Sequence, residues 1–182
     1  GWLLGDAAGV GLARHLGLLM MLQGAVSSLL GWNLTKGLLF PLFYAFFLVP
    51  FGEEFVPLLQ TVTAKMCMWL LGLSGIPAHL EGIFISTPNA LFRVAEACSG
   101  VKFLIAMVAL GALVSNLCFK SWSRRIAFMT VCVVVPIIAN GLRAFSTIYV
   151  GHHGNLQFAA SMDHVIYGWV FFAVVIALVL AI

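Results

Sequence analysis

Charged residues are scarce in this sequence. Only 8% of its 182 residues are charged, whereas 63% are hydrophobic and the mean hydropathy is +1.11. Because soluble domains carry about 25% charged residues, the composition excludes a soluble domain. The net charge of +3 is small and local, which argues against a nucleic-acid partner. Internal repeats, low-complexity tracts and long linkers are also lacking.

The sequence is instead dominated by apolar runs that approach or exceed the roughly 18 to 20 residues needed to cross about 30 Å of hydrocarbon. We predict an all-α integral membrane protein, a polytopic helical bundle in contact with membrane lipid. Residues 1–182 are expected to form a single membrane-embedded domain, and a first residue other than Met indicates a fragment of a longer chain. The predicted spans are residues 16–30, 38–51, 101–119, 126–150 and 165–182.

The segment between the second and third of these spans is less regular. Residues 56–73 carry Lys65 inside an apolar helical pattern. A charge at mid-bilayer is costly, so both a short span and an interfacial amphipathic helix stay open. Alternation of apolar and polar residues in 82–86 and 91–94 predicts a small β-hairpin at the non-cytoplasmic face. Two strands alone are marginally stable, so this hairpin should lean on the helices.

A run of basic residues gives the orientation. Three of the six residues in 120–125 are basic, and the positive-inside tendency places this loop in the cytoplasm. Cys98 lies 22 residues before the run and Arg143 lies 18 residues after it, which at about 1.5 Å per residue puts them about 33 Å and about 27 Å away. His164 opens the next span from the outer side. The three side chains are therefore predicted to share one layer near the outer membrane surface.

A cysteine, an arginine and a histidine in one layer suit acyl transfer. The thiolate of Cys98 would attack a carbonyl, the guanidinium of Arg143 would stabilise the oxyanion, and His164 would move the proton. Cys98 is also expected at the start of a helix, where unpaired N–H groups favour a thiolate. Glu96 either orients Arg143 or Arg93, or is a charge at the end of the hairpin.

Each of these residues also has a plainer interpretation. Arg143 could extend to the outer headgroups. Asn140 shares its helix face at i, i+3 and could hold Arg143, bind substrate backbone or join two helices. His164 could be an interfacial residue with Asp163 as the helix cap.

The remaining cysteines, histidines and glutamates indicate no cofactor and no metal. No CxxC motif occurs, and Cys98 by itself could be a small hydrophobic residue, as we expect of the other three cysteines, Cys67, Cys118 and Cys132. The pair His152-His153 lacks a spaced third ligand. The pair Glu53-Glu54 resembles the glutamates of intramembrane CAAX-type proteases, but no arginine follows at the required spacing, and a solvated helix end is favoured.

Three motifs occur in a characteristic order. They are Glu96-Ala97-Cys98-Ser99-Gly100 with Phe103 behind it, Asn140-Gly141-Leu142-Arg143, and Asp163-His164 with Tyr167-Gly168-Trp169 behind it. From about Leu38 to the end, the sequence resembles the exosortase and archaeosortase family of membrane transpeptidases. Each motif is weak alone, and the ordered set is specific. Histidine at the third position resembles the bacterial exosortases, whereas archaeal relatives are expected to carry arginine there.

The resemblance implies a multi-pass protein of the bacterial inner membrane with an active site that faces the periplasm. Its substrates would be exported proteins that end in a Pro-Glu-Pro-like (PEP-CTERM) motif, a transmembrane helix and a basic tail. The nucleophile maps to Cys98, the arginine to Arg143 and the third residue to His164, and we expect Glu96, Asn140 and Asp163 to support them.

By analogy with sortases, Cys98 would form a thioester that an unknown acceptor nucleophile releases, in a system linked to exopolysaccharide export. The alternative is a non-catalytic membrane scaffold, or a subunit of a polysaccharide or protein export system, in which the polar residues are structural.

Overall fold

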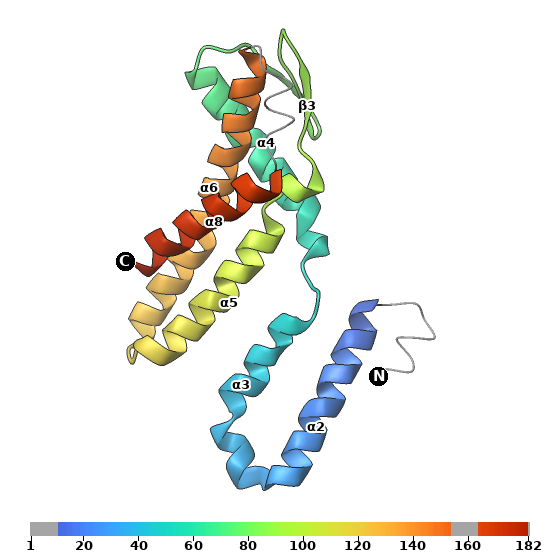
Figure 1. Cartoon of the computed structure of the whole chain (residues 1–182), viewed down its shortest axis with the longest axis vertical. Helices are drawn as coiled ribbons and strands as arrows, with labels where there is room; N and C mark the ends of the chain where they lie inside the picture. The colour runs from blue at the N-terminus through green and yellow to red at the C-terminus, as the bar shows by residue number, and fades with distance from the viewer. Residues whose placement is uncertain (1–10, 154–163, 182) are drawn as a thin grey trace. The chain divides into compact units, whose positions relative to one another are not determined.

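A computed structural model describes residues 11–153 and 164–181, which belong to two compact units, Gly1–Gly52 and Glu53–Ile182. The prediction of a helical membrane protein is confirmed (Figure 1). Within the described residues, four helices are long and apolar enough to cross a membrane: Gly11–Gly37, Glu53–Leu73, Val101–Cys118 and Trp122–His152.

The first unit is built from α2 (Gly11–Gly37), α3 (Leu39–Tyr44) and the 3-10 helix η1 (Ala45–Leu48). Gln23 ties α2 to α3, because its Nε2 donates a hydrogen bond to the carbonyl oxygen of Leu42 at 2.8 Å. The apolar helix found in the predicted span 38–51, which consists of α3 and η1, is shorter than expected.

The reason for this early end lies at a proline. The helical segment covers only Leu39–Leu48, about half the length of a membrane span. Val49 has an extended backbone with ψ of 129°, the conformation that the ring of the following Pro50 imposes on the residue before it. Apolar composition thus continues past the point where helical geometry ends.

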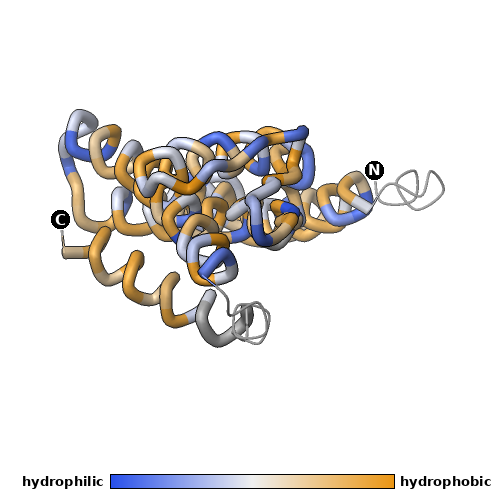
Figure 2. Tube along the Cα trace, turned by 90° about the horizontal axis from the view of Figure 1, so that it is seen from above, coloured by the Kyte–Doolittle hydropathy of each residue, from blue (hydrophilic) through white to orange (hydrophobic). Residues whose placement is uncertain are grey.

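The second unit is organised around α6 (Trp122–His152), against which α4 (Val56–Leu73), α5 (Val101–Cys118) and α8 (His164–Leu180) pack (Figure 1). Helix α5 lies along the first half of α6. The two helices approach closely, since a Cβ added to Gly111 of α5 would lie 2.7 Å from Sγ of Cys132 of α6. The second half lies against α4, where the thiol of Cys67 faces the carbonyl oxygen of Gly141 at 3.9 Å. Apolar residues follow one another along nearly all of α8 (Figure 2).

Residues 56–73, which the sequence left open, form one continuous helix with two unlike faces. Lys65 and Trp69 lie one turn apart on the exposed face of α4. Its buried face carries the polar residues Gln60 and Thr63 among less polar ones. The buried residues are Leu59, Gln60, Thr63, Ala64, Cys67 and Leu71.

A small antiparallel sheet follows α4, with the strands β1 (His79–Glu81), β2 (Phe84–Ser86) and β3 (Leu91–Arg93) in that order. The predicted hairpin corresponds to β2 and β3. The additional strand β1 was missed, because three residues are too few for alternation to be recognised. Ile85 of β2 is fully buried in a cluster with residues of α4 and α6, so the sheet leans on the helices as predicted.

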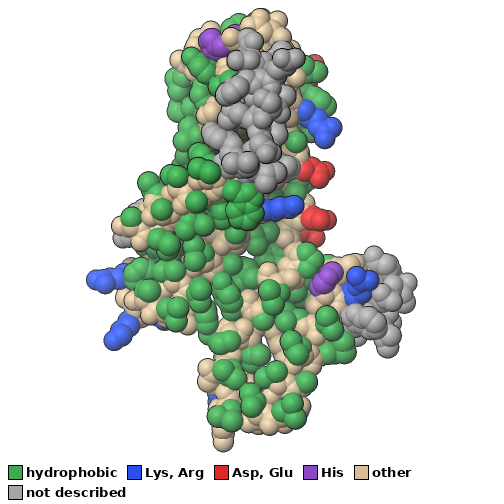
Figure 3. Space-filling view, in the orientation of Figure 1, with side chains coloured by type: hydrophobic (Ala, Val, Ile, Leu, Met, Phe, Trp, Pro, Cys, Tyr) green, Lys and Arg blue, Asp and Glu red, His purple; other side chains and the backbone are tan. Residues whose placement is uncertain are grey.

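The loop between α5 and α6 marks the other end of this unit. Lys120 and Arg124 are exposed there, and basic side chains project from this end in the space-filling view (Figure 3). Hydrophobic side chains are spread over the remaining visible surface of the helices, as expected for helices that face lipid (Figure 3).

Candidate active site

Cys98 lies in a short turn between the sheet and α5. It is the last residue of the 3-10 helix η3 (Glu96–Cys98), and its amide donates a hydrogen bond to the carbonyl oxygen of Ala95 at 2.8 Å. The side chain of Cys98 is half-buried. Gly100 follows in the left-handed conformation with φ of +78° and caps α5, which begins at Val101. Cys98 therefore lies three residues before the helix instead of at its first residue, because the turn at Gly100 separates the two.

Asn140 of α6 holds this turn from the side. Its Nδ2 donates hydrogen bonds to the carbonyl oxygen of Cys98 at 2.7 Å and to Oγ1 of Thr63 at 3.2 Å. Both Asn140 and Thr63 are only 3% exposed. A Cβ on Gly100 would lie 2.7 Å from Cγ of Asn140, so this close approach requires glycine both for space and for its positive φ.

Arg143 lies one turn further along α6 and is connected to the same amide. Its Nη2 donates a hydrogen bond to Oδ1 of Asn140 at 3.5 Å. The guanidinium Cζ lies 5.4 Å from the ring centroid of Phe103, in cation–π geometry. Arg143 is 7% exposed, which weighs against a residue that only anchors the helix in outer headgroups.

The first turns of α8 close the site on a further side. A Cβ on Gly168 would lie 3.3 Å from Nη1 of Arg143 and 3.7 Å from Cζ of Phe103. His164 is the first residue of α8, one helical turn before Gly168. Its side chain, like all of Asp163, lies outside the described residues. Glu96, the first residue of η3, is exposed.

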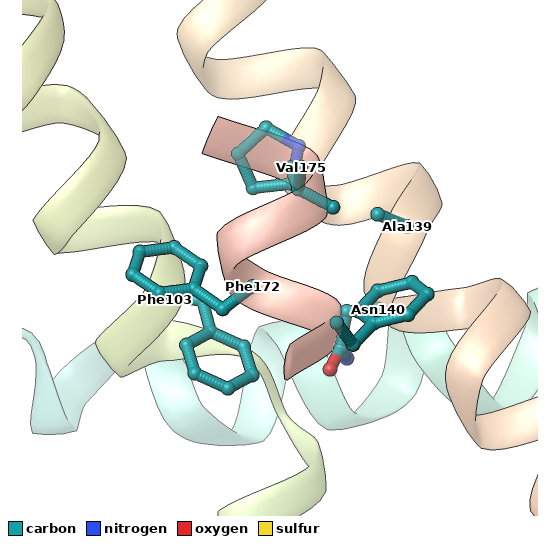
Figure 4. A pocket seen from close by; sticks show the side chains of 7 residues that line it. Phe103, Ala139, Asn140, Phe172 and Val175 are labelled. Carbon is teal, nitrogen blue, oxygen red and sulfur yellow. The ribbon is translucent and has the colours of Figure 1, made fainter. Parts of the chain in front are cut away.

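Aromatic and aliphatic side chains pack beside the polar residues Asn140 and Arg143. The rings of Phe103 and Phe172 stack at 4.8 Å between α5 and α8 (Figure 4). They border a cavity of about 10 Å³, which holds about one water molecule and is too small for a peptide side chain. The cavity is lined by Phe103, Pro136, Ala139, Asn140, Phe171, Phe172 and Val175.

Chemically, the arrangement combines a half-buried thiol, a buried guanidinium and an amide that connects their two chain segments. Such a group can hold a nucleophile and a cation for an oxyanion in fixed relation. Among residues 11–153 and 164–181, no three His, Cys, Asp or Glu side chains come together as a metal site would require.

The family of the chain follows from a sequence match that covers nearly its whole length. Residues 1–181 match the family described as "Transmembrane exosortase". The chain belongs to this family. The resemblance that the three ordered motifs indicated is confirmed, and the match extends it to the residues before Leu38. No curated protein and no solved structure matches the chain.

Within this exosortase-family protein, sequence reasoning missed one contact of the site. Thr63 comes from α4, outside all three motifs, and touches Asn140. The available signal was Gln60 and Thr63, two polar residues at i, i+3 on an otherwise apolar helical face. The same reasoning recognised Phe103 and Gly168 as motif residues but did not predict that both lie against Arg143.

Proposed function

We propose that this protein is a cysteine protease and transpeptidase of the bacterial inner membrane, with its active site at the periplasmic face. It acts on exported proteins that carry the C-terminal PEP-CTERM-type signal, in a system linked to polysaccharide export. The observation that carries the proposal is the Asn140 amide, which bonds both to the backbone of Cys98 and to the side chain of Arg143.

The proposed reaction has two steps. His164 takes the thiol proton of Cys98, and Sγ attacks the carbonyl carbon of the scissile peptide bond. Arg143 stabilises the oxyanion that forms. The carbon–nitrogen bond then breaks, His164 gives the proton to the leaving amine, and the substrate's N-terminal part stays on Cys98 as a thioester.

An acceptor nucleophile, an amine or water, completes the reaction. It attacks the thioester carbonyl, loses its proton to His164, and returns the thiol of Cys98. Asn140 supports this chemistry by holding the turn of Cys98, and Glu96 and Asp163 are proposed as further supporting residues. Glu96 is suited to this because it begins the turn that Cys98 ends.

Replacement of the proposed nucleophile tests the function. In cells with an exported reporter that carries the sorting tail, Cys98→Ala should abolish removal of the tail. The matched control is Cys118→Ala, since Cys118 is an exposed cysteine at the far end of α5, and it should process the reporter normally. Unchanged processing by Cys98→Ala would favour the non-catalytic scaffold instead.

A further inference from the structure

Two polar residues on the buried face of α4 hold the segment that carries Cys98. Gln60 is 7% exposed, and its Nε2 donates a hydrogen bond to the carbonyl oxygen of Val94 at 2.8 Å. Thr63, one turn later, accepts the hydrogen bond from Asn140, which in turn bonds to Cys98. The five-residue segment 94–98 is therefore connected to one face of α4 at both ends, directly at Val94 and through Asn140 of α6 at Cys98.

The carbonyl of Cys98 and the guanidinium of Arg143 set the orientation of the Asn140 amide, and Thr63 accepts its remaining N–H. An amide has two N–H donors and one carbonyl acceptor in a plane. Here the donors go to Cys98 and Thr63, while Oδ1 faces the guanidinium of Arg143. If the amide turned over, its oxygen would face the carbonyl of Cys98 and its NH₂ would face a cation. The hydroxyl of Thr63 is the third contact, which satisfies the second N–H of this buried amide and holds the amide in place against α4.

We propose that Gln60 and Thr63 are positioning residues, through which α4 sets the relation between the Cys98 turn and Arg143. The inference rests on the proposed function, because it assigns α4 a part in the same reaction. Their hydrogen bonds go to Val94 and Asn140 and so act on the site through these residues. Their removal should lower the rate of the chemical step and leave substrate binding almost unchanged.

Three substitutions on α4 separate this role from ordinary helix packing. Thr63→Val keeps the shape of the side chain but removes the hydroxyl, whereas Thr63→Ser keeps the hydroxyl. Thr61→Val is the matched control, because Thr61 is exposed and bonds only within its own helix, to the carbonyl oxygen of Pro57. The readout is kcat and KM of purified full-length protein in lipid nanodiscs, with a reporter that carries the sorting tail.

We expect Thr63→Val to lower kcat about tenfold, the effect of about one hydrogen bond, with KM within about twofold. Thr63→Ser and Thr61→Val should keep the original kcat. Equal loss in the serine and valine variants at position 63, or none in Thr63→Val, overturns the proposal. If Thr63→Val cannot be purified folded, Gln60→Met supplies the same test: a similar fall in kcat supports the proposal, and an unchanged kcat overturns it.

Cys98→Ala in the same assay keeps the two proposals apart. If this variant still processes the reporter, the proposed function fails. If it is inactive while Thr63→Val retains full kcat, the function stands and the positioning role fails.

Discussion

Arg143 is a charged residue that the protein buries, and burial of a guanidinium is costly unless its donors are bonded. It makes a hydrogen bond to Asn140 and a cation–π contact to Phe103. These contacts hold the planar guanidinium in one orientation. At the scale of single residues, the proposed catalysis therefore depends on the shape of this guanidinium as well as on its charge.

Arg143→Lys keeps the charge but loses the planar fork of donors. We expect the processing rate to fall about 10²- to 10³-fold, as when an oxyanion donor is removed. The measurement is the rate at which membranes that contain the variant remove the reporter's sorting tail. Arg93→Lys, at an exposed position on β3, is the control and should have little effect. A rate for Arg143→Lys within a few-fold of the original would contradict the role of the guanidinium.

Gly100→Ala should damage the site through the backbone. The new Cβ would lie 2.7 Å from Cγ of Asn140, and φ of +78° is unfavourable for alanine. We expect a loss of about 1–3 kcal/mol of stability, measured as a lower Tm in detergent, together with loss of processing. Gly72→Ala, where a Cβ meets nothing within 4 Å, should leave both unchanged. Equal Tm values for the two variants would exclude the close contact.

Part of the site could be predicted at this scale and part could not. Helical rise counted from the basic loop at 120–125 placed Cys98 and Arg143 in one layer, and Asn140 connects the two in the structure. The rise could not show which hydrogen bonds join them. Thr63 was missed because its neighbour is 77 residues away in sequence, and only the packing of α4 on α6 brings the two together.

At the scale of elements, the sheet contributes one buried side chain to the support of the Cys98 segment. Ile85 is 0% exposed, whereas its neighbour Phe84 is 42% exposed. Ile85 packs in the same cluster as Val94 and Leu71. The strand thus stabilises the segment that leads to Cys98.

Ile85→Ala should destabilise the sheet and the helices it packs on by about 2–5 kcal/mol, because the substitution leaves a cavity in a packed cluster. Limited proteolysis of purified protein should then cut the sheet region faster than in the original. Phe84→Ala removes a larger but exposed side chain and should change the cleavage rate much less. Equal protease sensitivity of the two variants would contradict the packing of the sheet on the helices.

The elements also show where sequence patterns mislead. Hydropathy extended the second predicted span to residue 51, yet the apolar helix ends at Leu48, because Pro50 constrains the backbone before it. Helix α6 was predicted well, since its apolar run is long and its internal proline, Pro136, does not end the helix.

At the scale of the whole molecule, the proposed periplasmic active site requires one orientation in the membrane. The α6 helix has 31 residues, about 46 Å at 1.5 Å per residue, so it exceeds the hydrocarbon thickness of about 30 Å. With its basic start in the cytoplasm, its last turns would extend into the periplasm beside the sheet, to which Asn89 ties them through the carbonyl oxygen of His152 at 2.8 Å.

Labelling of introduced cysteines tests this orientation, and the native Cys67 and Cys132 that remain are buried. Ser86→Cys in β2 and Ser123→Cys near the start of α6 both lie at exposed positions, and each would be made in a chain with Cys98→Ala and Cys118→Ala. In intact spheroplasts, a membrane-impermeant maleimide should label position 86 and not position 123. Labelling at position 123 and not at position 86 would show that the orientation is the reverse of the predicted one.

A thioester between Cys98 and the substrate is detected by mass spectrometry of protein quenched with acid during processing. We predict an adduct on Cys98 with the mass of the substrate's N-terminal part, which hydroxylamine releases. Processing without such an adduct, or an adduct that persists in Cys98→Ala, would contradict this prediction.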